Sequence, residues 1–258
     1  MIIDTHAHIA DIRFDSDREI VIQNAFNLGV KKIFEVACEN SYWDKALELS
    51  KRDNIFVSFG IHPNNVSKTT HEDFDKLKTL VKNEKCIAIG EIGLDYHYNN
   101  NSSFTGSINF QKELFIKQIG IANKCNKPII VHCRDAYDDI IDVLGRYKSS
   151  LKGVVHCFSG NLKQAKVFIK MGFLLGIGGI LTYNKSDNLK HVVFETDINN
   201  LLCETDCPYL TPKKYRGQRN EPSYVVETLR EIAKIKKMLF SEVVQITTQN
   251  ALKLFSIW

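Results

Sequence analysis

The sequence lacks the long apolar runs that would place a protein in a membrane. No uninterrupted apolar segment approaches the ~20 residues that a membrane span needs. The first residues also lack a basic segment followed by an apolar stretch, so we expect no secretory signal peptide. These absences predict a soluble, cytoplasmic protein with no membrane partner. Nothing in the sequence indicates an obligate protein partner.

A disulfide signature is also missing. The seven cysteines are an odd number, no pair has the spacing Cys-x-x-Cys, and the intervals match no disulfide framework. Reduced cysteines agree with a cytoplasmic location. Strand alternation predicts that four of them turn towards an outer helix layer as small packing residues: Cys133, Cys157, Cys203 and Cys207.

A strong excess of one sign of charge is missing as well. The chain has 34 lysines and arginines against 30 acidic residues, a formal net charge of +4. This small excess favours an anionic partner only weakly, and a dedicated nucleic-acid coat protein would carry a denser basic patch. With 44% hydrophobic and 25% charged residues, the composition is that of a globular protein with an ample core.

No linker, low-complexity tract or repeat divides the 258 residues, so we expect one domain over residues 1–258. What is present is a rhythm of short apolar runs separated by helix-patterned segments. Each run is rich in Val, Ile, Leu or Phe and ends in polar residues or glycine, as buried parallel strands do. The runs are "MIIDTHAH", "KIFEVAC", "NIFVSFGIHP", "CIAIGEIGLD", "PIIVHCR", "GVVHCFSG", "GFLLGIGG" and "LLCETDCP".

Eight strands that alternate with helices predict an α/β fold, a closed (β/α)₈ TIM barrel. An open doubly wound sheet is the alternative, but the GxGxxG fingerprint that it often carries is missing after the first run. Residues 222–258 predict two further helices that close the barrel.

Polar residues gather where these strands end. In the first run, Asp4, His6 and His8 occupy alternate positions and so should share one face of the strand. Further imidazoles and carboxylates follow at the ends of later runs, where a barrel places its chemistry. These residues are His62, Glu91, His132, His156, Glu204 and Asp206.

A divalent cation explains this gathering. Unpaired carboxylates and imidazoles inside a barrel would be costly to desolvate, whereas a metal ion binds both. A single His-x-His pair arises often by chance, and a lone acidic residue commonly caps a helix. Coincidence at the same end of one barrel is a poor explanation for the whole set, which exceeds what one tetrahedral ion accepts. We therefore expect two divalent ions held by His6, His8, Glu91, His132, His156 and Asp206.

The mixed donor set leaves Mg²⁺, Mn²⁺ and Zn²⁺ open. Asp4 and Glu204 lie two residues before His6 and Asp206 on the same strand faces, and so suit a role in orienting these ligands.

Contacts to an anionic substrate are less defined. Arg134 could reach the same space, and so could Arg216 in the basic loop "KKYRGQR", with an ordinary solvated loop as the alternative. After the fourth run, Tyr96, Tyr98 and Phe104 lie in a long segment that we interpret as a flap, where they either stack on bases or pack the flap down.

The motifs "DTHAH", "GIHP", "IGEIGLDY", "HCRDA", "HCFSG", "GIGG", "ETDCPYLTP", "YRGQRNEP" and "NALKLF" resemble, in this order, those of the TatD-type DNase family of metal-dependent hydrolases. The resemblance spans nearly the whole chain. It implies that His6 and His8 bind one ion, that Asp206 completes this first site, and that Glu91 bridges to a second ion held by His132 and His156. His62 would lie just outside. It also implies 3′-to-5′ exonuclease or related phosphodiesterase activity on DNA, acting on single strands or 3′ ends.

In this interpretation a metal-activated water attacks phosphorus, with Asp206 and Glu91 as catalytic residues. Other chemistry on the same metal platform stays open. The rivals are an amidohydrolase or deaminase, an esterase that removes D-amino acids from tRNA, and a metal-bound scaffold without turnover.

Overall fold

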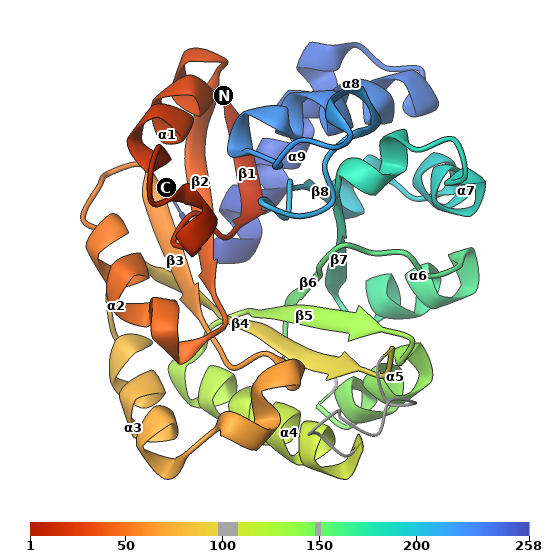
Figure 1. Cartoon of the computed structure of the whole chain (residues 1–258). Coiled ribbons are helices and arrows are strands. Elements are labelled where there is room, and N and C mark those ends of the chain that lie inside the picture. Colours follow the sequence, from red (N-terminus) through yellow and green to blue (C-terminus); the bar gives the residue numbers. More distant parts are fainter. Residues whose placement is uncertain (98–107, 148–150, 258) are drawn as a thin grey trace.

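The structure is a computed structural model that describes residues 1–97, 108–147 and 151–257. Within these residues, eight parallel strands follow one another in sequence order and curl into a single (β/α)₈ barrel (Figure 1), as predicted. The strands are β1 (Ile2–Ala7), β2 (Val30–Ala37), β3 (Ile55–Phe59), β4 (Cys86–Asp95), β5 (Ile129–Arg134), β6 (Gly153–Val155), β7 (Phe173–Ile177) and β8 (Leu201–Cys203). Each of the eight apolar runs is thus a strand.

Helices surround the strands on the outside of the barrel (Figure 1). They are α1 (Arg18–Asn27), α2 (Asn40–Leu49), α3 (His71–Leu80), α4 (Ile108–Cys125), α5 (Tyr137–Gly145), α6 (Leu162–Lys170), α7 (Asp187–Glu195), α8 (Val225–Lys236) and α9 (Phe240–Phe255). Local sequence fixes where some of them begin. Before α3, the Thr70 hydroxyl accepts from the backbone N–H of Asp73, whose carboxylate accepts from that of Thr70. No described helix combines the length and apolarity needed to cross a membrane.

Hydrogen bonds between β1 and the residues that follow β8 tie the first strand to the last. The His8 N–H donates to the Cys207 carbonyl (2.8 Å), and the Asp206 N–H donates to the His6 carbonyl (2.9 Å). Ala7 and Cys207 form a parallel bridge beside them. The closure of the barrel therefore brings the histidines of the first strand next to Asp206.

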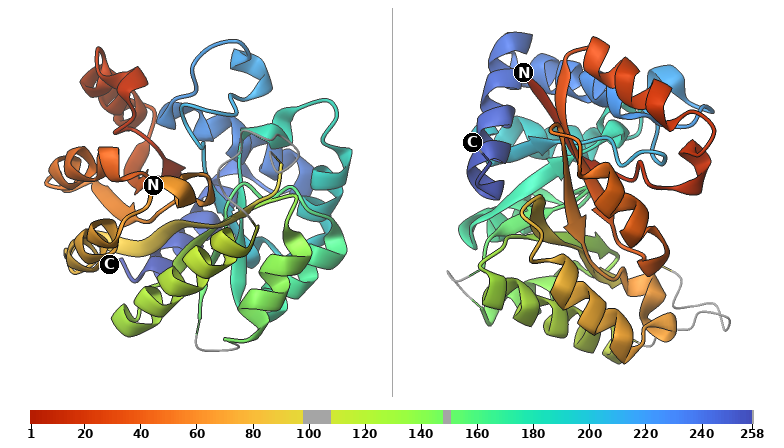
Figure 2. Two further views of the ribbon diagram at one scale, coloured as in Figure 1. Left: turned by 60° about the horizontal axis from the view of Figure 1, so that its bottom comes forward. Right: turned by 90° about the vertical axis from the view of Figure 1, so that its left-hand side faces the viewer.

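The barrel interior is apolar at the end where the strands begin. Side chains from β1, β2, β4, β5, β6 and β8 meet there with three residues of the C-terminal segment: Ala251, Phe255 and Ile257. Helix α9 is held by hydrogen bonds from Thr248 to the Met1 carbonyl and from Asn250 to the Leu201 carbonyl. Figure 2 shows α9 at this end, opposite the loops that follow the strands. Of the two helices predicted to close the barrel, only α9 does so, because α8 lies in the outer ring.

Close approach between β4 and β5 depends on a glycine. Gly93 has φ +150°, and a Cβ atom there would lie 2.0 Å from the His132 carbonyl oxygen. Gly93 and His132 are direct partners in the register of the two strands. The missing side chain lets β4 pack against β5, so that the Glu91 carboxylate can reach the ring of His132.

Most of the predicted flap lies outside the described residues, including Tyr98 and Phe104. Tyr96 belongs to the described part, where its hydroxyl donates to Asp139 Oδ2 (2.7 Å) and its ring packs against the hydrophobic core. Tyr96 therefore follows the packing alternative and not the stacking one.

Candidate metal centre

A cavity of about 520 Å³ opens at the end of the barrel where the strands finish. Its size is typical of small-molecule sites. Side chains from six strands or the residues just after them border it: His8, His62, Glu91, His132, His156 and Asp206. Glu91 lies within β4, which continues to Asp95, whereas the sequence suggested that this strand ends at Glu91.

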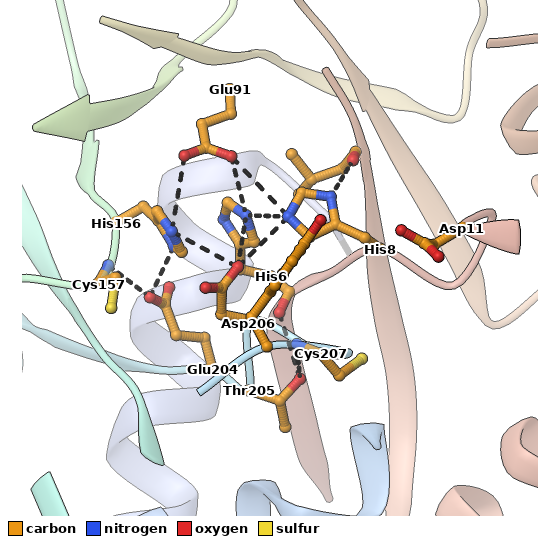
Figure 3. A network of polar contacts seen from close by, with 12 residues as sticks. His6, His8, Asp11, Glu91, His156, Cys157, Glu204, Thr205, Asp206 and Cys207 are labelled. Atoms are coloured by element: carbon orange, nitrogen blue, oxygen red, sulfur yellow. Dashed lines mark hydrogen bonds and ion pairs between the residues drawn. The ribbon is translucent and has the colours of Figure 1, made fainter. Parts of the chain in front are cut away.

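One group of ligand atoms gathers around a single oxygen of Glu91. Its Oε2 lies 3.5 Å from His6 Nε2 and 3.9 Å from His8 Nε2. Asp206 Oδ1 lies 3.7 Å and 3.3 Å from the same two nitrogens. Figure 3 shows these side chains pointing towards a common centre. We call His6, His8, Glu91 and Asp206 the first group.

The other oxygen of Glu91 faces a second group of imidazoles. Its Oε1 lies 2.6 Å from His132 Nδ1, 3.6 Å from His156 Nε2 and 3.7 Å from His62 Nε2. The carboxylate of Glu91 thus stands between two sets of nitrogen atoms (Figure 3 shows the His156 side and the His6–His8 side). We call Glu91, His132, His156 and His62 the second group.

A hydrogen bond to His8 and an ion-pair contact to His156 indicate which ring nitrogen each of these histidines presents. His8 Nδ1 lies 2.7 Å from the Val36 carbonyl, so in the neutral ring it carries the proton and Nε2 keeps its lone pair. His156 Nδ1 lies 2.8 Å from Glu204 Oε1, and its Nε2 faces Glu91 and Asp206. Carboxylates and carbonyls behind metal-binding histidines have this role in metalloproteins.

Asp95 is a residue of the site that the sequence argument missed. Its Oδ2 lies 3.1 Å from His132 Nε2, so His132 spans two carboxylates, Asp95 and Glu91. The Asp95 backbone is held on both sides by the buried Gln111 amide. A signal was available: Asp95 is four residues after Glu91 and hence on the same face of an alternating strand.

His62 presents the opposite tautomer. Its Nδ1 accepts a hydrogen bond from the Asn64 N–H (3.1 Å), so the neutral ring carries its proton on Nε2, which points towards Glu91. Burial and the charge on neighbouring His132 lower the pKa of His62 to about 3, which keeps the ring neutral. In this tautomer the Nε2–H of His62 faces the Glu91 carboxylate and offers no lone pair to an ion.

The electrostatics of the two groups keep carboxylates ionised inside the protein. Burial raises carboxyl pKa values, yet the surrounding histidines hold the pKa of Glu91 well below its usual range and also lower that of Asp206. Burial likewise opposes charge on the rings, but the pKa of His8 rises to about 9 because of Asp206, and that of His156 to about 10 because of Glu204 and Glu91. Ionised carboxylates and charged imidazoles are thus packed together at one buried point.

These donors fit divalent metal ions. The Nε2 atoms of His6 and His8 are 3.2 Å apart, and the rings of His6 and His156 stack at 3.5 Å. Two ring nitrogens this close either share a proton or bind one cation together, and imidazole with carboxylate is the usual donor set for Zn²⁺ and Mn²⁺. Ligand atoms within 4.8 Å of one another form three such sets around Glu91 and Asp206: His6, His8 and Glu91; His6, His156 and Asp206; and His62, Glu91 and His132.

Asp4 does not join these ligands, which corrects the expectation that it shares a face with His6 and His8. Its carboxylate accepts from the Thr205 N–H (2.9 Å) and hydroxyl (2.6 Å). The pairing of β1 with β2 shifts register between Asp4 and Ala7, so simple alternation fails there. Asp4 instead fastens β1 to the segment that carries Asp206.

Cys157 also departs from its predicted position. It borders the cavity with φ +44° and does not turn to the helix layer. Its sulfur belongs to a further ligand-like set with His156 and Glu204. Burial raises the pKa of this thiol well above its usual value, and a protonated thiol is a poor metal ligand. Cys133 packs in the outer core and touches the cavity edge, whereas Cys203 and Cys207 pack in the outer core as expected.

Of the two arginines predicted to contact the substrate, one lies at the cavity and the other does not. Arg134 borders the cavity, but Arg216 is not among its lining residues in the described part of the chain and lies over the Tyr183 ring at 5.4 Å. Its neighbours are engaged with the protein: Lys214 pairs with Glu227 (3.0 Å), and Arg219 with Asp17 (2.7 Å). The basic loop therefore gives less support to phosphate binding than its composition suggested.

Glu35 is a second residue that the sequence argument passed over. It lies in β2, is 1% exposed and borders the cavity, and its Oε2 accepts from the Ala10 N–H (3.1 Å). Burial raises its pKa to about 7. A charged residue inside the apolar run "KIFEVAC" was the signal that could have found it.

Comparisons with known proteins agree with this geometry. The model of the family described as TatD related DNase matches residues 3–256. An uncharacterized metal-dependent hydrolase of Bacillus subtilis is 40% identical over 259 residues, with 100% of both chains covered. One from Escherichia coli K12 is 33% identical over 261 residues, covering 99% of this chain and 96% of its own.

Among solved structures, a TatD homologue from Escherichia coli K12 superposes with a TM-score of 0.92 at 29% identity. The match covers 100% of this chain and 98% of the homologue. Its barrel and that of the present chain therefore agree from end to end. The chain belongs to the TatD related DNase family of metal-dependent hydrolases.

Proposed function

We propose that this protein is a deoxyribonuclease that hydrolyses phosphodiester bonds of DNA from the 3′ end, with two divalent ions per chain. The observation that carries the proposal is the position of Glu91, whose two oxygens face two separate groups of imidazoles. Adjacent cation sites that share one carboxylate suit phosphoryl chemistry, in which two oxygens must be stabilised at once. The family description supports DNA as the substrate.

His6, His8 and Asp206 would hold one ion, His132 and His156 the other, and Glu91 both. Bound ions would supply a Lewis acid that activates water and neutralises phosphate charge. The ion-pair contacts of Asp206 all go through Oδ1 in the described residues, so we assign Oδ2 to the attacking water, which it orients and deprotonates. Glu204 and Asp95 keep His156 and His132 aimed at the centre.

Substrate binding rests on the cavity itself. Arg134 is exposed at its edge, where it can pair with a backbone phosphate of the bound strand. Affinity for DNA should then fall as salt rises, because phosphate contacts release counterions.

The test is cleavage of end-labelled single-stranded DNA with Mg²⁺, Mn²⁺ or Zn²⁺, and with chelator. Asp206→Asn should lower kcat by about 10²–10⁴-fold, the usual worth of a positioned acid or base, with little loss of stability. Asp187→Asn makes the same chemical change on the surface of α7, where the side chain is 90% exposed, and should leave kcat unchanged.

D-aminoacyl-tRNA is included as a rival substrate in parallel reactions. Deacylation of this tRNA without DNA cleavage would replace the proposal with ester hydrolysis on the same centre. Equal DNA cleavage by the wild type and Asp206→Asn would remove Asp206 from its catalytic role.

A further inference from the structure

Tyr209 lies at the rim of the cavity, three residues after Asp206. Its side chain is exposed, with 47% of its surface open to solvent. The backbone around it is firmly held, because the Tyr209 N–H donates to the Asp206 carbonyl (2.9 Å) and its carbonyl accepts from the Asn220 side-chain amide (2.6 Å). The position of the ring is therefore tied to that of Asp206.

The guanidinium of Arg13 packs against the Tyr209 ring and is itself held in place. The guanidinium carbon of Arg13 lies 4.2 Å from the centre of the Tyr209 ring. Arg13 is held by Asp11 through two side-chain hydrogen bonds, Nε to Oδ1 (2.9 Å) and Nη2 to Oδ2 (2.7 Å). Asp11 therefore fixes the position of Arg13 beside the ring.

The ring also stands next to the first group of candidate ligands. The centre of the His8 ring lies 6.0 Å from that of Tyr209, and the two planes meet at 80°. Leu210, which is 38% exposed, continues the apolar rim beside it. An aromatic face with a cation behind it, rigid and open to the cavity, is the form that proteins use to stack a nucleobase.

We propose that Tyr209 is a stacking platform for the base next to the phosphodiester that is cleaved. This inference rests on the proposed nuclease function and deepens it, since a base inside a duplex is covered on both faces and cannot lie flat on a protein ring. The substrate class that follows is single-stranded nucleic acid, or a duplex end whose terminal base has been unpaired. The site would be tolerant of base identity, because every base offers a flat face.

The experiment compares three otherwise identical single-stranded oligonucleotides: one intact, and two with an abasic residue on either side of the terminal phosphodiester. The wild type, Tyr209→Ala and Tyr209→Phe are assayed on each for kcat and KM. We expect Tyr209→Ala to lower kcat/KM on the intact strand on the order of tenfold, mainly through KM. On one of the abasic strands this loss should disappear. Tyr209→Phe keeps the ring and should behave as the wild type.

A matched control is Tyr215→Ala, which removes a tyrosine that stacks on Tyr224 at 4.0 Å and is not among the cavity-lining residues of the described chain. It should show no dependence on the abasic position. A binding readout separates stacking from turnover: in Asp206→Asn, an oligonucleotide with 2-aminopurine at the terminal base should lose fluorescence on binding. Adding Tyr209→Ala should restore it.

Several outcomes overturn the platform. One is an equal loss of kcat/KM on all three strands with Tyr209→Ala, which would mean that the ring acts through Arg13 or the fold. No loss on the intact strand, or no quenching that depends on Tyr209, also refutes it. These results leave the nuclease proposal intact, whereas a wild type inactive on every strand refutes both.

Discussion

The Glu204 carboxylate stands directly behind the ring of His156, with Oε1 2.8 Å from Nδ1. The same oxygen accepts from the Cys157 N–H (2.6 Å), so its position is fixed by backbone. His156 Nε2 is thereby aimed at Glu91 and Asp206. One buried acid therefore decides how a histidine in the metal centre is oriented.

Removal of this support should weaken metal binding without removing a ligand. We expect Glu204→Ala to lower metal affinity by about 10–100-fold, the usual effect of losing a carboxylate behind a metal-binding histidine. Glu204→Gln keeps an oxygen for the Cys157 N–H and should lose less. Competitive titration against a chelating dye measures both. The control is Glu48→Ala, at a side chain 68% exposed. Wild-type affinity in Glu204→Ala would contradict the assigned role.

Gly176 packs against the same Glu204 carboxylate, so a substitution there gives a second test of its role. A Cβ atom at Gly176 would lie 2.4 Å from Glu204 Oε2, so Gly176→Ala must displace that side chain. Metal affinity should fall, and Glu204→Ala combined with Gly176→Ala should lose little beyond Glu204→Ala alone, since both act on one interaction. Gly120→Ala, in α4 where a Cβ meets nothing within 4 Å, is the control and should stabilise by about 1 kcal/mol. Additive losses in the double variant would show that Gly176 acts elsewhere.

The bridging position of Glu91 predicts a loss of metal stoichiometry. Glu91→Gln weakens the shared ligand of both groups, so metal content per chain should fall below that of the wild type after gel filtration, as measured by mass spectrometry of the metals. Because ligands that bind only the folded state stabilise it, chelator should lower the wild-type melting temperature. The same chelator should change Glu91→Gln much less. An equal metal content in both proteins would rule out the bridge.

Glu35 predicts a dependence of stability on pH. Burial raises its pKa from 4.5 to about 7, so between these values the folded chain binds more protons at this site than the unfolded chain. The free energy of unfolding should therefore fall as pH rises through this window, by about 3 kcal/mol. Glu35→Gln still accepts from the Ala10 N–H but does not ionise. Urea unfolding at pH 5 and pH 8 should show a smaller fall in this variant, and an identical fall would contradict the burial argument.

Much of the architecture could be predicted because it follows from periodicity. The apolar runs mark all eight strands, since a parallel strand that is buried on both faces is apolar at nearly every position. His6, His8, His132, His156 and Asp206 meet because each lies near or just after the carboxyl end of a strand, and parallel strands of a barrel end on one side.

The remaining features depend on geometry that sequence does not encode locally. Asp4 holds the segment of Asp206 through Thr205 and does not share the face of His6 and His8, because a shift in strand pairing breaks the alternation there. Cys157 turns into the cavity because its backbone adopts a positive φ just after β6 ends. Arg216 was placed by the basic composition of its loop and by the position of that loop after the last strand, but its distance from the cavity depends on how the loop folds.

The central claim is that the two oxygens of Glu91 face two metal ions. The most direct measurement is anomalous diffraction from crystals grown with Mn²⁺. We predict two peaks, one between Glu91 Oε2 and the imidazoles of His6 and His8, the other between Glu91 Oε1 and those of His132 and His156. A map with no peak at either oxygen, at saturating Mn²⁺, would contradict the account.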